Sequence, residues 1–199
     1  MSLIQAYIDG SCNPNPGGVA YVGVYIPQQE GIVEEVKYQG FIGKGKKVSS
    51  NLAEYVAGIV ALKFLYNFRH EYDITLYTDS QLVVMQVNGS WSVRNGTYVP
   101  AYKMLTKLIK EFRYVNIQWI PREKNTIADS ISKGLHNGSR NSTKYLLTKL
   151  EESQNSLTVK DLQQILNQVE TYINEKSQQA NIFSNNNNGK FFQEILNLK

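Results

Sequence analysis

The 199-residue sequence contains a single cysteine, Cys12, and only two histidines. One cysteine excludes an intramolecular disulfide and any metal site built from several thiolates. Such sparse cysteine is typical of a reducing, intracellular compartment, so we expect a cytoplasmic protein. No run of about 18 apolar residues is present, and the N-terminus lacks the basic and apolar segments of a secretory signal. The sequence therefore predicts neither a membrane span nor secretion.

Charge of one sign does not dominate either, with 21 Lys and Arg against 17 Asp and Glu and a formal net charge of +4. Residues 1–137 carry 14 basic and 11 acidic side chains, which gives that segment a net charge of +3. If several of those acids hold metal ions, the remaining surface suits a polyanionic partner. Otherwise the same numbers describe a mildly basic soluble protein. The apolar fraction of 42% is sufficient for the core of one ordinary domain with an appendage.

The first 26 residues predict a β-hairpin with a carboxylate at the end of its first strand. Apolar side chains alternate over 3–8, and a second strand is expected over 19–26. Asp9 follows the first strand, and residues 11–18 are almost all turn formers, which lets the backbone approach a ligand closely. A carboxylate beside a glycine-rich loop is a common place for a metal ion. An aspartate before a glycine is, however, more often part of a plain turn.

Beyond the hairpin, hydrophobic periodicity predicts three more strands and four helices. A continuous apolar run is typical of a strand buried on both faces, and strict alternation is typical of a half-buried one. The order of the elements favours an α/β fold in which a mixed sheet carries helices on its faces. The strands expected after the hairpin are 34–41, 74–77 and 115–119, and the helices are 51–68, 81–87, 101–112 and 126 to about 135.

A basic loop is expected just before the first helix. Residues 43–47 include three lysines, and Ser49, Ser50 and Asn51 follow at the helix start. Cations beside hydroxyl and amide groups at a helix N-terminus would suit a phosphate. A solvated loop that ends in a helix cap explains the same residues equally well.

Three more carboxylates stand at element boundaries, and each has a structural explanation. Glu54 lies in the first turn of the first helix, where small residues on the same face would let it approach Asp9. The spacing of Asn51 and Glu54 also approximates a capping box. Asp79 follows the fourth strand, the usual end for ligands in open α/β sheets, but it could instead cap the next helix. Asp129 lies in the last expected helix.

Together the four carboxylates form a more specific pattern. Their surroundings read Y-I-D-G-S, N-L-A-E-Y, Y-T-D-S-Q and W-I-P-R-E-K-N-T-I-A-D, and they resemble the type 1 ribonuclease H family at all four positions. The resemblance covers residues 3 to about 135. It implies a five-stranded mixed sheet flanked by helices, with strands 1 to 3 antiparallel and strands 1, 4 and 5 parallel. It also implies that the four carboxylates meet at one rim of that sheet.

The resemblance further implies a chemistry for this rim. The four acids would be both the catalytic residues and the ligands of two Mg²⁺ ions, with Mn²⁺ as a substitute. The reaction in the family is endonucleolytic hydrolysis of the RNA strand of RNA–DNA hybrids, leaving 5′-phosphate and 3′-hydroxyl ends. Clustered carboxylates repel one another, so without metal we expect the site to be disordered or partly protonated. The implied ligands are Asp9, Glu54, Asp79 and Asp129.

Recognition of the RNA strand must use its 2′-hydroxyl, which DNA lacks. Amide side chains both donate and accept hydrogen bonds and therefore suit that role. The resemblance also implies that the two serines before the first helix bind a phosphate of the DNA strand. The residue types there differ from those of well-studied bacterial members. The substrate contacts implied are Gly10, Ser11, Asn15, Ser49, Ser50, Asn51, Gln81 and Arg122.

The sequence departs from many family members in two places. No histidine occurs in residues 119–124, and the W-I-P-R-E form looks like the branch found in archaea, some bacteria and plant-type proteins. Arg122 is there a candidate for contacting the scissile phosphate or, alternatively, for a structural salt bridge. The segment 89–99 is too short for the basic protrusion of some bacterial members, so we expect weaker hybrid binding. Two alternatives stay open: a catalytically silent nucleic-acid-binding module, and a nuclease that also cleaves double-stranded RNA.

The composition changes after residue 137, which divides a catalytic domain at 1–137 from an extension at 138–199. The extension is rich in Asn, Gln and Ser, and apolar residues recur at helical spacing between 162 and 173. We expect a helical segment whose apolar side is buried somewhere. It would pack on the main domain, mediate self-association or bind an unknown protein.

Overall fold

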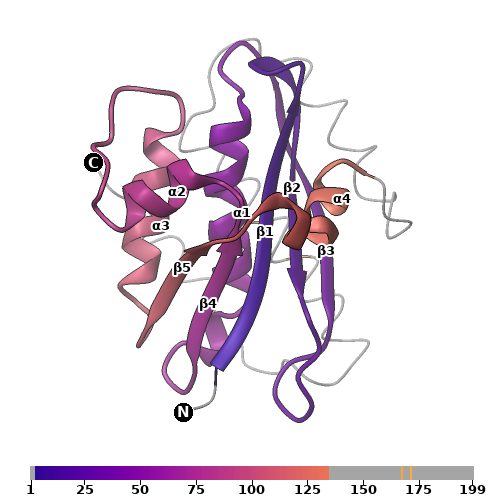
Figure 1. The fold of residues 1–199 in the computed structure, drawn as a ribbon, viewed down its shortest axis with the longest axis vertical. Coiled ribbons are helices and arrows are strands. Elements are labelled where there is room, and N and C mark those ends of the chain that lie inside the picture. Colours follow the sequence, from indigo (N-terminus) through magenta and orange to yellow (C-terminus); the bar gives the residue numbers. More distant parts are fainter. Residues whose placement is uncertain (1–2, 135–166, 168–170, 172–199) are drawn as a thin grey trace.

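A computed structural model describes residues 3–134 together with Asn167 and Thr171. The chain forms one five-stranded mixed sheet in the order β3-β2-β1-β4-β5 (Figure 1). β1 pairs antiparallel with β2 and β2 with β3, whereas β1, β4 and β5 run parallel. The predicted fold class is therefore confirmed. The strands are β1 (Leu3–Asn13), β2 (Gly17–Ile26), β3 (Val36–Gly45), β4 (Asp73–Thr78) and β5 (Val115–Trp119).

Helices cover both faces of the sheet. Neighbouring side chains of a strand point to opposite faces, and β1 shows both environments. Gly10 lies against α1, while Asp9 lies on the α4 side, next to Ser132. α3 packs on α1. The helices are α1 (Ser50–Phe64), α2 (Gln81–Val87), α3 (Val99–Ile109) and α4 (Thr126–Ser132), with 3₁₀ turns η1 (Tyr66–Phe68) and η2 (Arg122–Lys124).

The core lies between the sheet and α1, and continues between α1 and α3. Ile4, Ala6 and Ile8 point from β1 towards α1 and are fully buried. A side chain at Gly58 would meet Leu105 of α3 and Ile8 of β1. The sheet and α3 both pack against α1, and its residues 52–63 are all buried, which explains why it is apolar nearly all round.

Several predicted boundaries were wrong, mostly because strand pairing extends further than residue type suggests. β1 does not stop at Asp9 but continues to Asn13, because that segment still pairs with β2. β3 begins two residues later than expected and runs through Gly43 to Gly45, which were assigned to the basic loop. The turn-forming residues expected over 11–18 therefore lie largely within strands.

The helices agree more closely with the expectations. α2 and β5 have the predicted limits, and α1 ends at Phe64, before η1 begins at Tyr66. α3 runs from Val99 to Ile109 instead of the expected 101–112. The last helix ends at Ser132, three residues earlier than expected. The proposed boundary at 137 and the extension 138–199 lie outside the described residues, except for Asn167 and Thr171, which are helical. Among the described residues, no helix is long and apolar enough to cross a membrane.

Candidate active site

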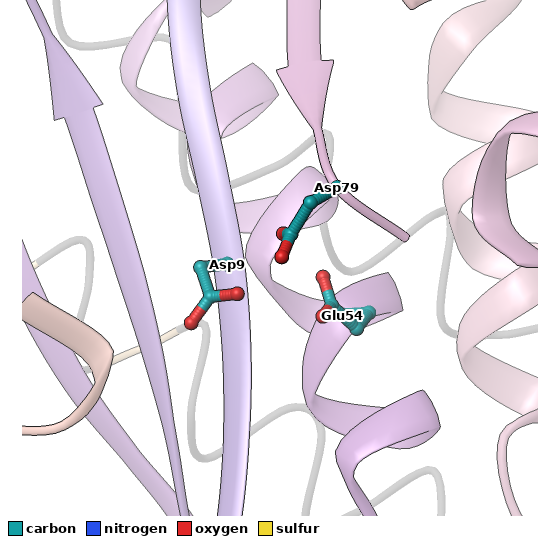
Figure 2. Close-up of side chains that lie close together, drawn as sticks. All are labelled: Asp9, Glu54 and Asp79. Atoms are coloured by element: carbon teal, nitrogen blue, oxygen red, sulfur yellow. The ribbon is translucent and has the colours of Figure 1, made fainter. Parts of the chain in front are cut away.

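Three carboxylates from separate elements meet at the rim of the sheet. Asp9 comes from β1, Glu54 from the second turn of α1, and Asp79 from the residue after β4. One oxygen of each lies within 4.8 Å of the others, and Figure 2 shows the three side chains directed towards a common point. In the sequence, Glu54 lies 45 positions after Asp9 and 25 positions before Asp79. The fold thus joins three distant residues into one acidic cluster.

A glycine explains how Glu54 reaches Asp9. A Cβ atom at Gly10 would lie 2.3 Å from the backbone nitrogen of Glu54 and 2.5 Å from the carbonyl carbon of Ala53. Only glycine lets α1 approach β1 this closely. The helix is capped by Ser49, whose hydroxyl accepts a hydrogen bond from the Leu52 amide. The capping-box explanation of Glu54 is therefore wrong, and its carboxylate is available to the cluster.

Asp79 also has no capping role. Ser80 occupies the N-cap position of α2, without a capping hydrogen bond from its side chain. The Oδ1 atom of Asp79 accepts a hydrogen bond of 3.1 Å from Nδ2 of Asn125, which also donates to the Ile8 carbonyl at 2.9 Å. Asn125 is only 1% exposed and so connects β1 to the end of β4 from behind the cluster. This arrangement fixes where the Asp79 carboxylate points.

Asp129 lies beside the cluster rather than within it. Its Oδ1 atom accepts a hydrogen bond from Arg122, and its Oδ2 atom lies 2.6 Å from Nζ of Lys133. The Nε atom of Arg122 lies 4.0 Å from Oδ2 of Asp79. The predicted meeting of four carboxylates is thus seen for three of them, with the fourth linked to the group through an arginine that makes salt bridges.

The cluster is electrostatically crowded. Burial, followed by the charges of Asp79 and Asp129, raises the pKa of Asp9 to about 6, although a hydrogen bond from Ser132 opposes the shift. Burial and the charges of Asp9 and Asp79 hold the pKa of Glu54 well above its ordinary value. Burial would also raise the pKa of Asp129, but the bonds and charges of Lys133 and Arg122 outweigh it and lower that pKa. Without a cation, the cluster therefore favours bound protons.

The amides expected to contact substrate are exposed near the rim. Asn15 lies in the β1–β2 turn, Asn51 in the first turn of α1, and Gln81 at the start of α2. Asn15 donates to the Ser50 hydroxyl at 2.9 Å and accepts from the Ser50 amide at 3.0 Å. This pair of hydrogen bonds holds the turn against the N-terminus of α1.

Other predicted contacts have internal partners. The Ser49 hydroxyl caps α1, and the Ser11 hydroxyl donates 2.7 Å to the carbonyl of Ser132. The backbone N–H of Gly10 is hydrogen-bonded to Glu54. The Arg122 side chain is 60% exposed and therefore accessible, despite its bonds to the carboxylates.

Three buried polar residues behind the cluster were not found from the sequence. Thr78, Asn125 and Ser132 are at most 1% exposed, and each has a hydrogen bond or close contact with a clustered carboxylate. Asn125 stands four residues before Asp129 in the quoted K-N-T-I-A-D motif, but that spacing alone does not reveal burial. Ser132 alone carried a signal, as a polar residue in a short packed helix that would otherwise fill the position with an apolar side chain. Thr78 ends β4 and Asn125 precedes α4, so neither stands out in this way.

Comparison with known proteins identifies the family. The profile of a family described as reverse transcriptase-like matches residues 8–134. The chain is also 31% identical to a crystal structure of RNase H1 from the archaeon Halobacterium salinarum, covering 66% of this chain and 96% of that one with a TM-score of 0.57. The chain belongs to the type 1 ribonuclease H family. The acidic cluster thus lies in a ribonuclease H domain.

Two further relatives show the range of this ribonuclease H family. LC11-RNase H1, in a crystal structure with an RNA/DNA hybrid, is 29% identical, with 67% of this chain covering 99% of that chain at a TM-score of 0.56. A bifunctional protein of Mycobacterium tuberculosis is 31% identical over 124 residues, which are 62% of this chain and 33% of that protein. The chain thus spans about a third of the length of this relative.

Proposed function

We propose that this ribonuclease H domain is a metal-dependent endonuclease that hydrolyses the RNA strand of RNA–DNA hybrids. The observation that carries the proposal is the convergence of Asp9, Glu54 and Asp79 within 4.8 Å at one rim of the family fold. The relative in complex with an RNA/DNA hybrid supports the choice of substrate. The products would carry 5′-phosphate and 3′-hydroxyl ends.

The donor set fits a hard divalent cation. Mg²⁺ prefers carboxylate oxygens and retains several waters, and Mn²⁺ accepts similar ligands. Two of the clustered acids are at most 9% exposed, and no cation of the described residues is ion-paired with either. Their negative charge is thus left for a metal to balance. We propose that two Mg²⁺ ions are held by Asp9, Glu54, Asp79 and Asp129.

Each group of the chain then has a defined task. When bound, the ions supply an activated water and stabilise the leaving oxygen. Asn125 holds Asp79 in place through the hydrogen bond that its Nδ2 atom donates to Oδ1 of Asp79. Arg122, exposed beside Asp129, is placed to meet a phosphate.

Recognition of the two strands is assigned to the exposed groups around the rim. The amides of Asn15, Asn51 and Gln81 can donate to and accept from 2′-hydroxyls. Ser49 and Ser50 at the start of α1, with Gly10 and Ser11 on β1, complete the surface proposed for the sugar–phosphate backbone. Lys44, Lys46 and Lys47 are exposed next to it and add positive charge.

The decisive experiment compares the native chain with Asp79→Asn on a labelled RNA–DNA hybrid in Mg²⁺. Since even residues behind a metal ligand contribute about 10–100-fold, loss of a ligand should slow cleavage by at least about 100-fold. Asp73→Asn is the matched control, because Asp73 lies at the opposite end of β4 in an ion pair with Arg113. EDTA should abolish cleavage.

The outcomes separate the alternatives. Internal RNA cleavage that requires Mg²⁺ and Asp79 but not Asp73 supports the enzyme. Hybrid binding without cleavage, equal in all three proteins, overturns it in favour of a silent binding module. A parallel reaction with double-stranded RNA shows whether the substrate range extends beyond hybrids.

A further inference from the structure

Ser132 is a buried hydroxyl in direct contact with the acidic cluster. It is the last residue of α4, is 0% exposed, and donates a hydrogen bond from Oγ to Oδ2 of Asp9. Figure 2 shows one oxygen of Asp9 directed towards Asp79 and Glu54 and the other turned away from them. Because Ser132 approaches from the α4 side of the sheet, it holds Asp9 from behind.

The hydroxyl has a second acceptor within reach, and the chemistry favours Asp9. Oγ of Ser132 lies 3.0 Å from the carbonyl of Asp129, one helical turn earlier. That carbonyl already accepts the backbone N–H of Lys133 at 3.2 Å. A carboxylate is the stronger acceptor, because hydrogen bonds to ionised groups are roughly twice as strong as neutral ones. The single hydroxyl proton therefore serves Asp9.

The close approach of Ser132 depends on a glycine opposite Asp9. Gly23 of β2 is the cross-strand partner of Asp9 and lies on the same face of the sheet. A Cβ atom at Gly23 would lie 2.3 Å from the Ala128 carbonyl oxygen and 2.7 Å from the Ser132 nitrogen. The backbone of α4 thus occupies the space that a side chain at position 23 would need. This close packing brings Ser132 beside the carboxylate of Asp9.

Two side chains of the sheet fix the end of α4 in this position. Ser11, on β1, donates to the Ser132 carbonyl at 2.7 Å. Gln39, on β3, donates to the Ile131 carbonyl at 2.7 Å. These bonds add side-chain donors to carbonyls at the C-terminus of α4, and the Ile131 carbonyl also accepts the backbone N–H of Gly134 at 3.0 Å. Ser132 is therefore held by three adjacent strands.

We infer that Ser132 is a positioning residue of the metal site, which fixes one oxygen of Asp9 so that the other faces the cluster. The inference rests on the proposed function, since it assigns a role towards the metal proposed there. Ser132 cannot touch substrate, because it is completely buried. Its effect must pass through the geometry of Asp9.

The test compares Ser132→Ala with Ser130→Ala in the full chain. Ser130 lies on the same helix, and its hydroxyl donates only to the Ile127 carbonyl, at 2.9 Å. The Mg²⁺-dependent rise in Tm is titrated for each protein, with the metal-free Tm as the measure of stability. Ser132→Ala should require about 10-fold more Mg²⁺ for half of the rise. Ser130→Ala should match the native chain.

Kinetics supply an independent readout. At saturating Mg²⁺, the KM of Ser132→Ala for the hybrid should stay within about 2-fold of native, since metal ligation rather than substrate contact is disturbed. An unchanged Mg²⁺ requirement, with only a lower metal-free Tm, would reduce Ser132 to a packing role and overturn the inference. If the alanine variant does not fold, Ser132→Cys retains the size with a weaker donor and should show the same direction of change.

Failure of the inference is distinguishable from failure of the proposed function. A raised Mg²⁺ requirement in Ser132→Ala supports the positioning role even if the native chain cleaves no hybrid. An active native chain whose Mg²⁺ requirement does not depend on Ser132 overturns the positioning role alone. A native chain that neither cleaves the hybrid nor gains Tm on addition of Mg²⁺ overturns both.

Discussion

Burial of Asp9 has opposite consequences for folding and for metal binding. The residue is 4% exposed, and its pKa rises from 3.8 to about 6 in the folded chain. Between these two pH values the folded state binds more protons than the unfolded state. The free energy of unfolding of the metal-free protein therefore falls as pH rises from about 4 to about 6, and the loss persists above that window.

The variant Asp9→Asn should remove this loss. The asparagine oxygen can still accept the hydrogen bond from Ser132, but the side chain no longer ionises. At pH 7 in EDTA, the variant should be more stable than the native chain by up to about 3 kcal/mol, and by much less at pH 4. Urea unfolding at both pH values measures the difference.

Magnesium should reverse this order of stability. A cation that binds only the folded state stabilises it by mass action, and the native chain has the full ligand set. Addition of Mg²⁺ should raise the native Tm markedly and that of Asp9→Asn little. A native chain that is more stable than Asp9→Asn at pH 7 without metal would contradict the raised pKa of Asp9.

The proposed metal ligands were accessible from the sequence, and the residues that orient them were not. Asp9, Glu54 and Asp79 stand in local motifs that resemble those of the family, so their convergence followed from the resemblance. Ser132 and Asn125 act through contacts with strands more than 100 residues away in the sequence. No local pattern of residue types encodes such a contact, because it exists only once the sheet has formed.

At the scale of elements, the spacing between β2 and α4 is set by Gly23. Because the nearest atoms belong to the backbone of α4, a methyl group there cannot be accommodated by a side-chain rotation. Gly23→Ala should shift α4 away from the sheet and carry Ser132 with it. We expect a loss of about 1–3 kcal/mol in the free energy of unfolding and a higher Mg²⁺ requirement.

Gly31→Ala separates this effect from a general cost of losing glycine. Gly31 has a φ of +70°, and a Cβ atom there would meet nothing within 4 Å. Its replacement should cost about 1–2 kcal/mol from backbone strain and leave the Mg²⁺ requirement unchanged. Equal Mg²⁺ requirements in the two variants would show that α4 does not need its close packing to support Asp9.

The elements themselves were predicted in type and order, whereas most of their ends were not. Glycine-rich segments were assigned to loops because glycine is common in turns. In the structure, Gly10, which was placed after the first strand, lies inside β1, whereas Gly23 lies inside β2 as expected. The two glycines admit α1 and α4 at close range. A glycine near a functional site can thus mark either close packing or a turn. Only the element that packs against the glycine distinguishes these two roles.

At the scale of the whole molecule, the described part of the chain accounts for a complete ribonuclease H fold. Residues 3–134 supply all five strands, the covering helices and the acidic cluster. The archaeal RNase H1 structure is matched over 96% of its length by 66% of this chain. All the proposed metal ligands and positioning residues therefore lie within residues 3–134.

A chain that ends at Asn137 should accordingly fold and cleave hybrids. Its kcat should lie within about 3-fold of the full chain, because every proposed ligand and positioning residue is retained. Apolar residues at helical spacing between 162 and 173 need a surface to cover. If that surface is the main domain, truncation should lower Tm by a few degrees, since about 1 kcal/mol corresponds to roughly 2–4 °C at this size.

The same pair of chains distinguishes the three roles proposed for the extension. A lower Tm with an unchanged molecular mass in solution indicates packing on the domain. An unchanged Tm with loss of a dimer indicates self-association. If neither the Tm nor the oligomeric state changes, binding of another protein is the remaining role. Loss of cleavage in a truncated chain that still folds would contradict the division at 137, because it would place an essential group beyond the sheet and its acidic rim.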